Sequence, residues 1–441
     1  MSAFGYITDL MRSELADTQL VQPCGRVTQV LGSVIHAVVP QAKMGEVCLL
    51  QVPGSNTEVH AEVIGFAKGT VLLTPLTEIR GLSVHTAVIP SGHSHCIQVG
   101  HELVGRVLDG LGQPLDAAEK GPLLSTELYP VCRNAPDPLL RKKISKPLGL
   151  GVKAVDALIT CGEGQRLGIF AAAGVGKSSL LGMLTKYAEV DITVVALIGE
   201  RGREVREFLD DQLGDHKGRK IITVVATADK PAMQRARAAE VATTIAEYFR
   251  EQGLSVLLLM DSLTRYARSL REIGLAAGEA PTRRGFPPSV FSSLQALLER
   301  AGQSDRGSIT ALYTVLMEAD DVNEPVADEV RSIVDGHIIL SRDIAASNQY
   351  PAIDVLGSLS RIMDAIVNPA HKANASNVRR LLSKYKEIEF LVKMGEYKVG
   401  ADAESDIALE KIDSIKRFLT QDMKEYYSLD QTITLLNEVV K

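Results

Sequence analysis

Residues 166–188 read RLGIFAAAGVGKSSLLGMLTKYA, and this stretch decides the fold. An apolar strand pattern, Arg166–Phe170, runs into small residues and then into a helical pattern, Ser179–Ala188. Small residues let successive backbone N–H groups close around a phosphate at a helix N-terminus, where the following lysine and serine reach the phosphates and Mg²⁺. The stretch therefore predicts a phosphate-binding loop, although Ala171 replaces the first glycine of the general pattern.

Two carboxylates follow apolar strands further along the chain. Asp261 ends the strand Val256–Met260, as is needed to support Mg²⁺ beside such a loop, and Glu200 comes just after the strand Ile192–Ile198. Because ligands of α/β sheets bind at this edge, we expect Glu200 to orient the water that attacks the γ-phosphate. The alternatives are a helix cap at Asp261, and ion pairs of Glu200 and Glu204 with Arg201 and Arg203 on a solvated face.

The rest of the chain divides into segments that differ in their pattern of apolar, turn-forming and charged residues. Short apolar runs from about 22 to 98 predict a small β-barrel or sandwich, and the turn-rich segment 99–150 predicts a linker laid over a domain. From 150 onward strands alternate with helices, which is typical of a mostly parallel sheet wrapped by helices, and after about 360 the chain is helical and charged. The expected strands of the sheet are Arg166–Phe170, Ile192–Ile198, Ile221–Ala226, Val256–Met260, Ile309–Val315 and Gly336–Leu340.

The composition of the 441 residues excludes disorder and collagen, with 45% hydrophobic and 23% charged residues. A net charge of −6 gives no bulk attraction to nucleic acid or to an anionic membrane, and the absence of Trp disfavours a stacking platform for single strands. Five scattered cysteines without a C-x-x-C pair favour a reducing compartment over disulfides or zinc. The cluster His93, His95, Cys96 and His101 indicates a solvated linker rather than a metal site.

The N-terminus is too charged for a signal peptide, and we find no run of about 18 uncharged apolar residues that would span a membrane. We therefore expect a cytosolic protein. Residues 1–20 place apolar residues at near-helical spacing, which predicts either a helix that docks onto a partner or a helix packed on its own domain.

Four segments together resemble the ATPase of bacterial type III protein secretion and flagellar export: GVGKS at 174–178, GERGREV at 199–205, the run 257–294 that contains MDSLTRYARSLREIG and PTRRGFPPS, and PAIDVLGSLSR at 351–361. That family is similar to the catalytic subunit of rotary ATP synthases, and the likeness runs from about residue 22 to the C-terminus. It implies an α/β fold with a RecA-like parallel-sheet core.

The resemblance also implies four parts of the chain. These are a partner-docking segment at 1–20, an oligomerisation β-barrel at 21–98, a linker with the ATPase core at 99–360, and a C-terminal helical domain at 361–441.

Residue roles follow from the same resemblance. It implies that Lys177, Glu200 and Arg361 are catalytic, with Arg361 as an arginine finger that acts on a neighbouring subunit, and that Ser178 and Asp261 hold Mg²⁺. Without the family, Arg361 is more typical of a surface salt bridge. The implied nucleotide-binding residues are Ala173, Gly174, Val175, Gly176, Lys177, Ser178, Ser179 and Arg201.

The implied activity is Mg²⁺-dependent ATP hydrolysis at subunit interfaces of a homo-oligomeric ring, expected to be a hexamer, which energises protein export. Implied partners are a coiled-coil central stalk near the acidic segment 401–406, a peripheral-stalk regulator at the N-terminus, secretion chaperones with their cargo, and the export gate. Helix capping by Asp402 explains the acidic segment equally well. We expect no nucleic acid partner, and only peripheral membrane contact at the cytoplasmic face of the inner membrane.

Alternatives remain for both the function and the base contact. The chain is similar also to rotary ATP synthase subunits and to RNA-translocating hexamers, and a platform that only binds nucleotide is a further alternative that Glu200 argues against. Where rotary relatives carry an aromatic residue that stacks on adenine, this sequence has the non-aromatic stretch Pro369–Lys372. Tyr426 and Tyr427 supply either an aromatic face for the base or packing in the helical tail.

Overall fold

The computed structural model describes residues 23–54, 58–67, 69–79, 81–212, 220–317, 324–400 and 402–441. The expected docking segment at 1–20 lies outside these residues. The chain divides into two compact units, one that contains the N-terminal barrel and one that contains the residues from Cys96 onward, apart from a short stretch near 277.

A closed six-stranded barrel forms the first unit, with strand order β1-β2-β5-β4-β3-β6. Alternate side chains such as Ile35, Leu50 and Leu73 fill its interior, as the strand period of two requires. The expected barrel is thus confirmed. Its strands are β1 (Gly25–Leu31), β2 (Val34–Val38), β3 (Glu46–Gln51), β4 (Glu58–Ala67), β5 (Thr70–Pro75) and β6 (Ala87–Ser94).

The second unit is built on a nine-stranded sheet with the order β19-β18-β12-β17-β15-β13-β14-β8, in which β16 also pairs with β17. The strands from β8 to β18 along this order run parallel, as expected, and only β16 and β19 are antiparallel. The strands are β8 (Val107–Asp109), β12 (Arg166–Ala171), β13 (Ile192–Ile198), β14 (Ile221–Ala226), β15 (Ser255–Asp261), β16 (Gly302–Gln303), β17 (Ser308–Leu316), β18 (Gly336–Leu340) and β19 (Leu359–Ser360).

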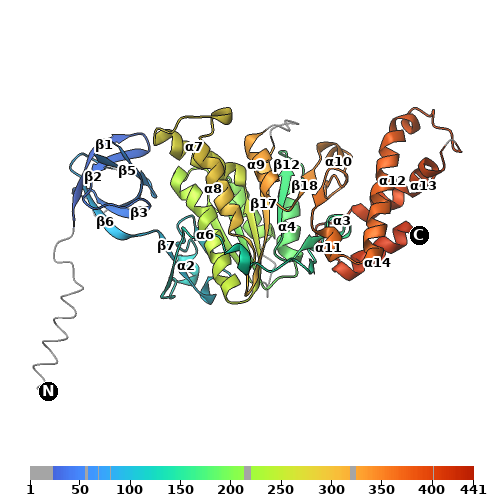
Figure 1. Cartoon of the computed structure of the whole chain (residues 1–441), viewed down its shortest axis with the longest axis horizontal. Helices are drawn as coiled ribbons and strands as arrows, with labels where there is room; N and C mark the ends of the chain where they lie inside the picture. The colour runs from blue at the N-terminus through green and yellow to red at the C-terminus, as the bar shows by residue number, and fades with distance from the viewer. Residues whose placement is uncertain are drawn as a thin grey trace, which may run out of the picture. The chain divides into compact units, whose positions relative to one another are not determined.

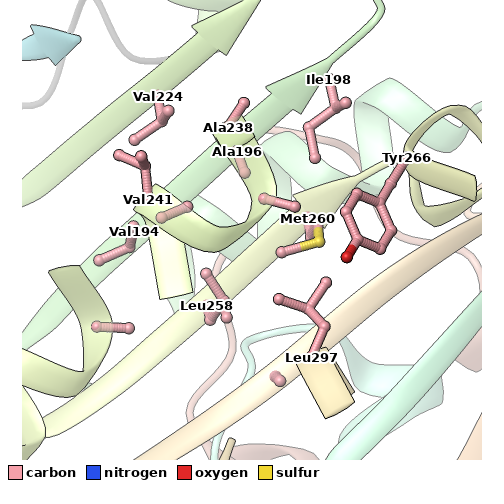
Figure 2. Close-up of a cluster of buried hydrophobic side chains, with 14 of the residues drawn as sticks. Val194, Ala196, Ile198, Val224, Ala238, Val241, Leu258, Met260, Tyr266 and Leu297 are labelled. Atoms are coloured by element: carbon pink, nitrogen blue, oxygen red, sulfur yellow. The ribbon is translucent and has the colours of Figure 1, made fainter. Parts of the chain in front are cut away.

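Buried side chains alternate between the two faces of this sheet because both faces are covered by helices. Val194, Ala196 and Ile198 of β13 point to the layer that holds α6 and α8, whereas Val195 and Leu197 point to the layer that holds α4. The helices lie on opposite sides of the strands (Figure 1). Figure 2 shows the first layer, in which Val194, Ala196, Leu258 and Met260 meet Ala238, Val241, Tyr266 and Leu297.

The helices of this unit before residue 360 are α2 (Ala117–Lys120), α3 (Lys153–Leu158), α4 (Lys177–Tyr187), α5 (Gly202–Glu207), α6 (Ala232–Glu251), α7 (Leu263–Ala276), α8 (Pro288–Glu299), α9 (Pro325–Ile333) and α10 (Arg342–Ala346). Short 3₁₀ turns cover η1 (His101–Leu103), η2 (Pro138–Leu140) and η4 (Arg283–Gly285), and a π-helical turn, η3 (Phe208–Gln212), extends α5.

The segment 99–150 does more than link two domains. It contributes β8 to the edge of the main sheet beside β14, and β9 (Glu127–Pro130) pairs with β7 (Cys96–Val99) in a separate ribbon. A three-residue strand between turn residues has too short a pattern to be found in the sequence. A second ribbon joins β10 (Pro147–Leu148) to β11 (Cys161–Gly162).

After residue 360 the chain is helical, as expected, with α11 (Met363–Ile366), α12 (Pro369–Lys393), α13 (Ala403–Leu419) and α14 (Leu429–Val440). Side chains of Asn368, Asp402 and Ser428 cap the last three helices at their N-termini. The acidic segment that begins at Asp402 therefore forms a helix start. These helices pack on α3 and continue the core beneath α4.

In the described ranges no helix has the length and apolarity that a bilayer crossing requires. The same ranges contain no group of three or more His, Cys, Asp or Glu side chains arranged to hold a metal ion. The ring of His93 lies within hydrogen-bond distance of the backbone carbonyl of the neighbouring residue, Ser94.

We predict that Leu258→Ala destabilises the second unit by about 2 to 5 kcal/mol, because Leu258 is fully buried in the central strand β15 and its removal leaves a cavity. Leu124→Ala is the matched control, since Leu124 is 79% exposed. The midpoint of urea unfolding measures both variants. Equal midpoints for the two would contradict this description of the core.

Candidate active site

The phosphate-binding loop lies where β12 ends and α4 begins. Gly174 and Gly176 adopt left-handed backbone angles, with φ of 80° and 84°, which other residues adopt only with strain. Lys177 is the first residue of α4, so the free backbone N–H groups of the first helical turn face the loop. The predicted residues Ala173–Ser179 therefore form one continuous turn at a helix N-terminus, which is the geometry that an anion-binding loop requires.

The ammonium of Lys177 lies between two carboxylates. Its Nζ is 2.5 Å from Oδ1 of Asp261 and 3.6 Å from Oε1 of Glu200. All three side chains are largely buried. The structure thus brings together three of the residues that the sequence singled out, from segments 84 residues apart.

The strand order explains this meeting. β12 and β15 are separated by β17, and with strands about 4.8 Å apart the two ends lie roughly 10 Å apart, a gap that the long lysine side chain spans. Thr314 of the intervening strand donates a hydrogen bond of 2.7 Å from its hydroxyl to Oδ1 of Asp261. Asp261 is therefore fixed from both sides.

Glu200 is held by an arginine that the sequence analysis did not single out. Nη2 of Arg265 lies 3.2 Å from Oε2 of Glu200, and its Nη1 donates to the carbonyl of Gly199. Gly199 makes room for this contact, because a Cβ there would lie 2.9 Å from Cδ of Arg265. The other oxygen of Glu200, Oε1, is buried and accepts no hydrogen bond within the part of the chain that the structure describes.

Burial raises the pKa of Glu200 to about 7, and the nearby charge of Asp261 adds to the effect, while Lys177 opposes it. A hydrogen bond with Glu204 raises it further. A carboxyl group with this pKa gains or loses its proton near neutral pH. Solvated ion pairing of Glu200 with Arg201, the alternative considered above, is not what the structure shows.

A cavity of about 170 Å³ opens beside these groups. Its lining combines the hydroxyls of Ser178 and Ser179 with the carboxylates of Glu200, Glu204 and Asp261. Hydroxyl and carboxylate oxygens are the ligands that Mg²⁺ prefers together with phosphate oxygens and water. The donor set therefore fits Mg²⁺, and Oε1 of Glu200, which is buried and accepts no hydrogen bond from the described residues, fits a hydrogen bond to a water molecule.

Neither Arg201 nor Arg361 belongs to the lining of this cavity. The side chain of Arg201 is 76% exposed and lies 3.6 Å from the carboxylate of Glu204. Arg361 is exposed, and its backbone N–H donates to Asp335, which pairs with the start of β12 at Arg166. Since β12 runs five residues from there to the loop, Arg361 lies about 16 Å along the strand from the loop of its own chain.

Comparison with known proteins agrees with this geometry. Residues 151–360 match the nucleotide-binding domain of the ATP synthase alpha/beta family, residues 27–92 match the beta-barrel domain of that family, and residues 367–438 match the T3SS EscN ATPase C-terminal domain. A type 3 secretion system ATPase of Xanthomonas euvesicatoria is 52% identical over 97% of both chains. The chain belongs to the type III secretion and flagellar ATPases.

Further relatives include a type 3 secretion system ATPase of Sinorhizobium fredii, 51% identical over 95% of this chain and 92% of that protein, and a flagellum-specific ATP synthase of Bacillus subtilis, 46% identical over 94% of each. The assembled ATPase EscN of enteropathogenic E. coli superposes with a TM-score of 0.90 at 47% identity, covering 95% of this chain and 100% of that one. The resemblance read from the sequence is confirmed, and the chain is an ATP hydrolase.

The ATPase carries an aromatic ring at the loop that the sequence analysis missed. A Cβ on Gly176 would lie 3.2 Å from two ring carbons of Tyr350, so this ring packs directly over the phosphate-binding loop. Tyr350 is 39% exposed, which leaves part of the ring free. A signal existed in the sequence, since Tyr350 immediately precedes the family segment PAIDVLGSLSR.

Both stretches considered earlier for the base lie elsewhere in the ATPase. His371, within Pro369–Lys372, is buried at the start of α12 with its Nε2 2.8 Å from the carbonyl of Ala157. Tyr426 packs against Tyr187, at the C-terminal end of α4, with ring centroids 5.4 Å apart. At 1.5 Å per residue that end is about 15 Å from Lys177, so packing explains Tyr426.

We predict an acid limb in the pH dependence of kcat/KM for ATP, with a midpoint near 7, because kcat/KM reports the free enzyme and the pKa of Glu200 is raised to about 7. The carboxylate form increases as the pH rises, so activity falls on acidification. Steady-state assays in excess Mg²⁺ between pH 5.5 and 9 measure the limb.

Glu204→Gln is the informative variant. It removes the hydrogen bond that raises the pKa of Glu200, so the limb moves to lower pH. Titration of the nucleotide itself would leave the limb where it is in this variant, and an unmoved limb would show that Glu200 is not the titrating group.

Proposed function

We propose that this ATPase hydrolyses MgATP at interfaces between identical subunits of a ring and so energises protein export through a type III secretion apparatus, of the virulence or the flagellar kind. The named relatives support the pathway, since they include ATPases of both systems. Assembly is supported by the solved EscN structures, one assembled and one in complex with its central stalk EscO.

The position of Arg361 carries the proposal. Lys177, Glu200 and Asp261 meet in one place, whereas Arg361 is exposed at the opposite edge of the same sheet. Because Arg361 lies about 16 Å along the strand from the loop of its own chain, the phosphates that it would contact are those of a neighbouring subunit. A head-to-tail contact that repeats the same interface closes into a ring when its rotation permits.

We assign each group a task in this proposal. Lys177 exchanges part of its contact with the carboxylates of Asp261 and Glu200 for contact with the β- and γ-phosphates. Ser178 and Asp261 hold Mg²⁺, which supplies charge neutralisation at the phosphates. Glu200 accepts a hydrogen bond from the attacking water at Oε1, and Arg265 fixes the orientation of its carboxylate. Arg361 of the adjacent subunit stabilises the charge of the transition state, and Arg201 turns toward the nucleotide when the interface forms.

Tyr350 gives the base a face to stack on. Its ring already lies over Gly176, where the loop leads into α4, and it remains partly exposed. An aromatic face binds any base, so selectivity for adenine comes from groups around the ring rather than from the ring itself.

The proposed partners act on the barrel and on the helical domain. We assign the barrel to contacts between copies of the ATPase, and the helices α12 to α14 to a coiled-coil central stalk and to secretion chaperones with their cargo. The peripheral-stalk regulator belongs to the N-terminal segment, which the described residues do not include. Contact with the export gate places the ring at the cytoplasmic face of the inner membrane. The proposal includes no nucleic acid partner.

We predict that Lys177→Ala and Arg361→Ala are each nearly inactive, and that an equimolar mixture regains activity. An interface is complete when the loop comes from the Arg361→Ala chain and the arginine comes from the Lys177→Ala chain. Random mixing makes about one quarter of the interfaces complete. ATP turnover of chains co-refolded or co-expressed in equal amounts measures the recovery.

Wild-type protein that is co-refolded or co-expressed by the same procedure controls for losses in refolding. Mass spectrometry of the rings establishes that both variants are present in one assembly. Inactive mixed rings would refute a shared site, and wild-type activity that stays near zero at every protein concentration would show that a different subunit or a nucleic acid is missing.

We predict that Tyr350→Ala raises KM for ATP about five- to thirty-fold with a smaller change in kcat, because a lost stacking face costs about 1 to 2 kcal/mol of binding. Tyr350→Phe keeps the ring and should restore KM. A Tyr350→Ala enzyme with unchanged KM would place the base elsewhere.

A further inference from the structure

A second cavity, of about 680 Å³, lies between the core and the helical domain. It is bounded by the start of α3, by the turn after α10 and by the end of α13, and its lining contains none of the residues Ala173–Ser179. The volume is within the range of small-molecule sites. The cavity is therefore distinct from the phosphate-binding loop.

Lys153 lies in the wall of this cavity as a buried cation. Its side chain is 6% exposed, and its ammonium lies 4.6 Å from the ring centroid of Tyr427 and 5.9 Å from that of Phe418. Within the described residues the ammonium forms no ion pair; burial lowers the pKa of Lys153, and the charge of Glu425 opposes this shift. Aromatic faces compensate only part of the cost of burying a charge.

Two further cations reach the cavity from α13. The ammonium of Lys416 lies 4.9 Å from the ring centroid of Tyr385, and Nε of Arg417 donates to the carbonyl of Asp413 at 3.3 Å. Neither side chain is within 4 Å of a carboxylate in the described ranges. The lining thus contains three cationic residues, the buried Lys153 and the exposed Lys416 and Arg417, and none of them has a carboxylate within 4 Å in the described ranges.

The acidic residues of the lining are engaged by their own turn. Asp422 accepts a hydrogen bond from the backbone of Lys424 at 2.9 Å, and Glu425 accepts one from the backbone of Asp422 at 3.3 Å. Across the cavity, the carboxamides of Asn348 and Gln349 form no hydrogen bond with any described residue, so their N–H groups are available as donors.

We propose that this cavity binds a small molecule through a phosphate group. A phosphate dianion offers several acceptor oxygens to one buried ammonium, a second ammonium and a guanidinium, and it accepts from carboxamides as well. A single carboxylate carries less charge and fewer acceptors for the same donors. This site is independent of ATP hydrolysis at the loop, and its test requires no turnover.

A ligand in this cavity would contact residues of both the helical domain and the core. Gln421, also in the lining, accepts a hydrogen bond from the backbone of Lys153 at 2.8 Å, and its own backbone donates to the carbonyl of Tyr350 at 2.9 Å. The ligand would therefore lie beside the residue that connects α13 with the aromatic ring over the loop, which is a suitable position for a regulator.

The test uses the absence of Trp from this chain. Tyr427→Trp introduces a sole tryptophan against Lys153, and Lys177→Ala in the same chain weakens binding at the phosphate-binding loop. Titration with pyrophosphate, inorganic phosphate and citrate is followed by tryptophan emission. We expect saturable binding of pyrophosphate, and an at least tenfold higher Kd when Lys153→Met is added.

Lys398→Met is the matched control, because it removes the same charge from the exposed surface of the helical region, outside the cavity lining, and should leave Kd unchanged. Thermal unfolding with and without pyrophosphate, in chains that keep Tyr427, gives a second readout, with a rise in Tm that Lys153→Met abolishes.

No saturable change with either phosphate probe would overturn the proposal. So would binding that Lys153→Met leaves unaltered, and binding of citrate alone would overturn the assignment to phosphate.

Discussion

One ion cluster organises the active site: the ammonium of Lys177 between the carboxylates of Asp261 and Glu200. Two buried carboxylates so close together are costly unless a cation lies between them. The lysine is the first residue of a helix whose N-terminus also favours negative charge. Every other feature of the site either positions one of these three groups or is positioned by them.

The sheet order makes that cluster possible. β17 separates the strand before the loop from the strand that ends in Asp261, and Thr314 of β17 hydrogen-bonds to this carboxylate. Glu200 follows β13, the next strand beyond β15, so its carboxylate reaches the same end of the sheet. The parallel arrangement places these strand ends at one edge, and both faces must be apolar because helices cover each of them.

The helical domain contacts α4 near both of its ends. At the loop end, the ring of Tyr350 lies over Gly176, and its carbonyl accepts a hydrogen bond from Gln421. At the other end, the hydroxyl of Tyr187 donates to the carbonyl of Met423 at 3.1 Å. Gln421 and Met423, which follow α13, are thus joined by hydrogen bonds to residues at both ends of α4.

The sequence by itself determined the parallel sheet, the loop and the two carboxylates, because these depend on local patterns: apolar runs of strand length, glycines that allow left-handed turns, and acidic residues at strand ends. The motifs also determined the family, whereas the role of Arg361 as an arginine finger stays a prediction from that family. Only the tertiary structure decided that Arg265 orients Glu200, that Tyr350 covers the loop and that β8 joins the sheet. Those contacts join residues far apart in the chain, and no local period or spacing encodes which distant side chain fills a given space.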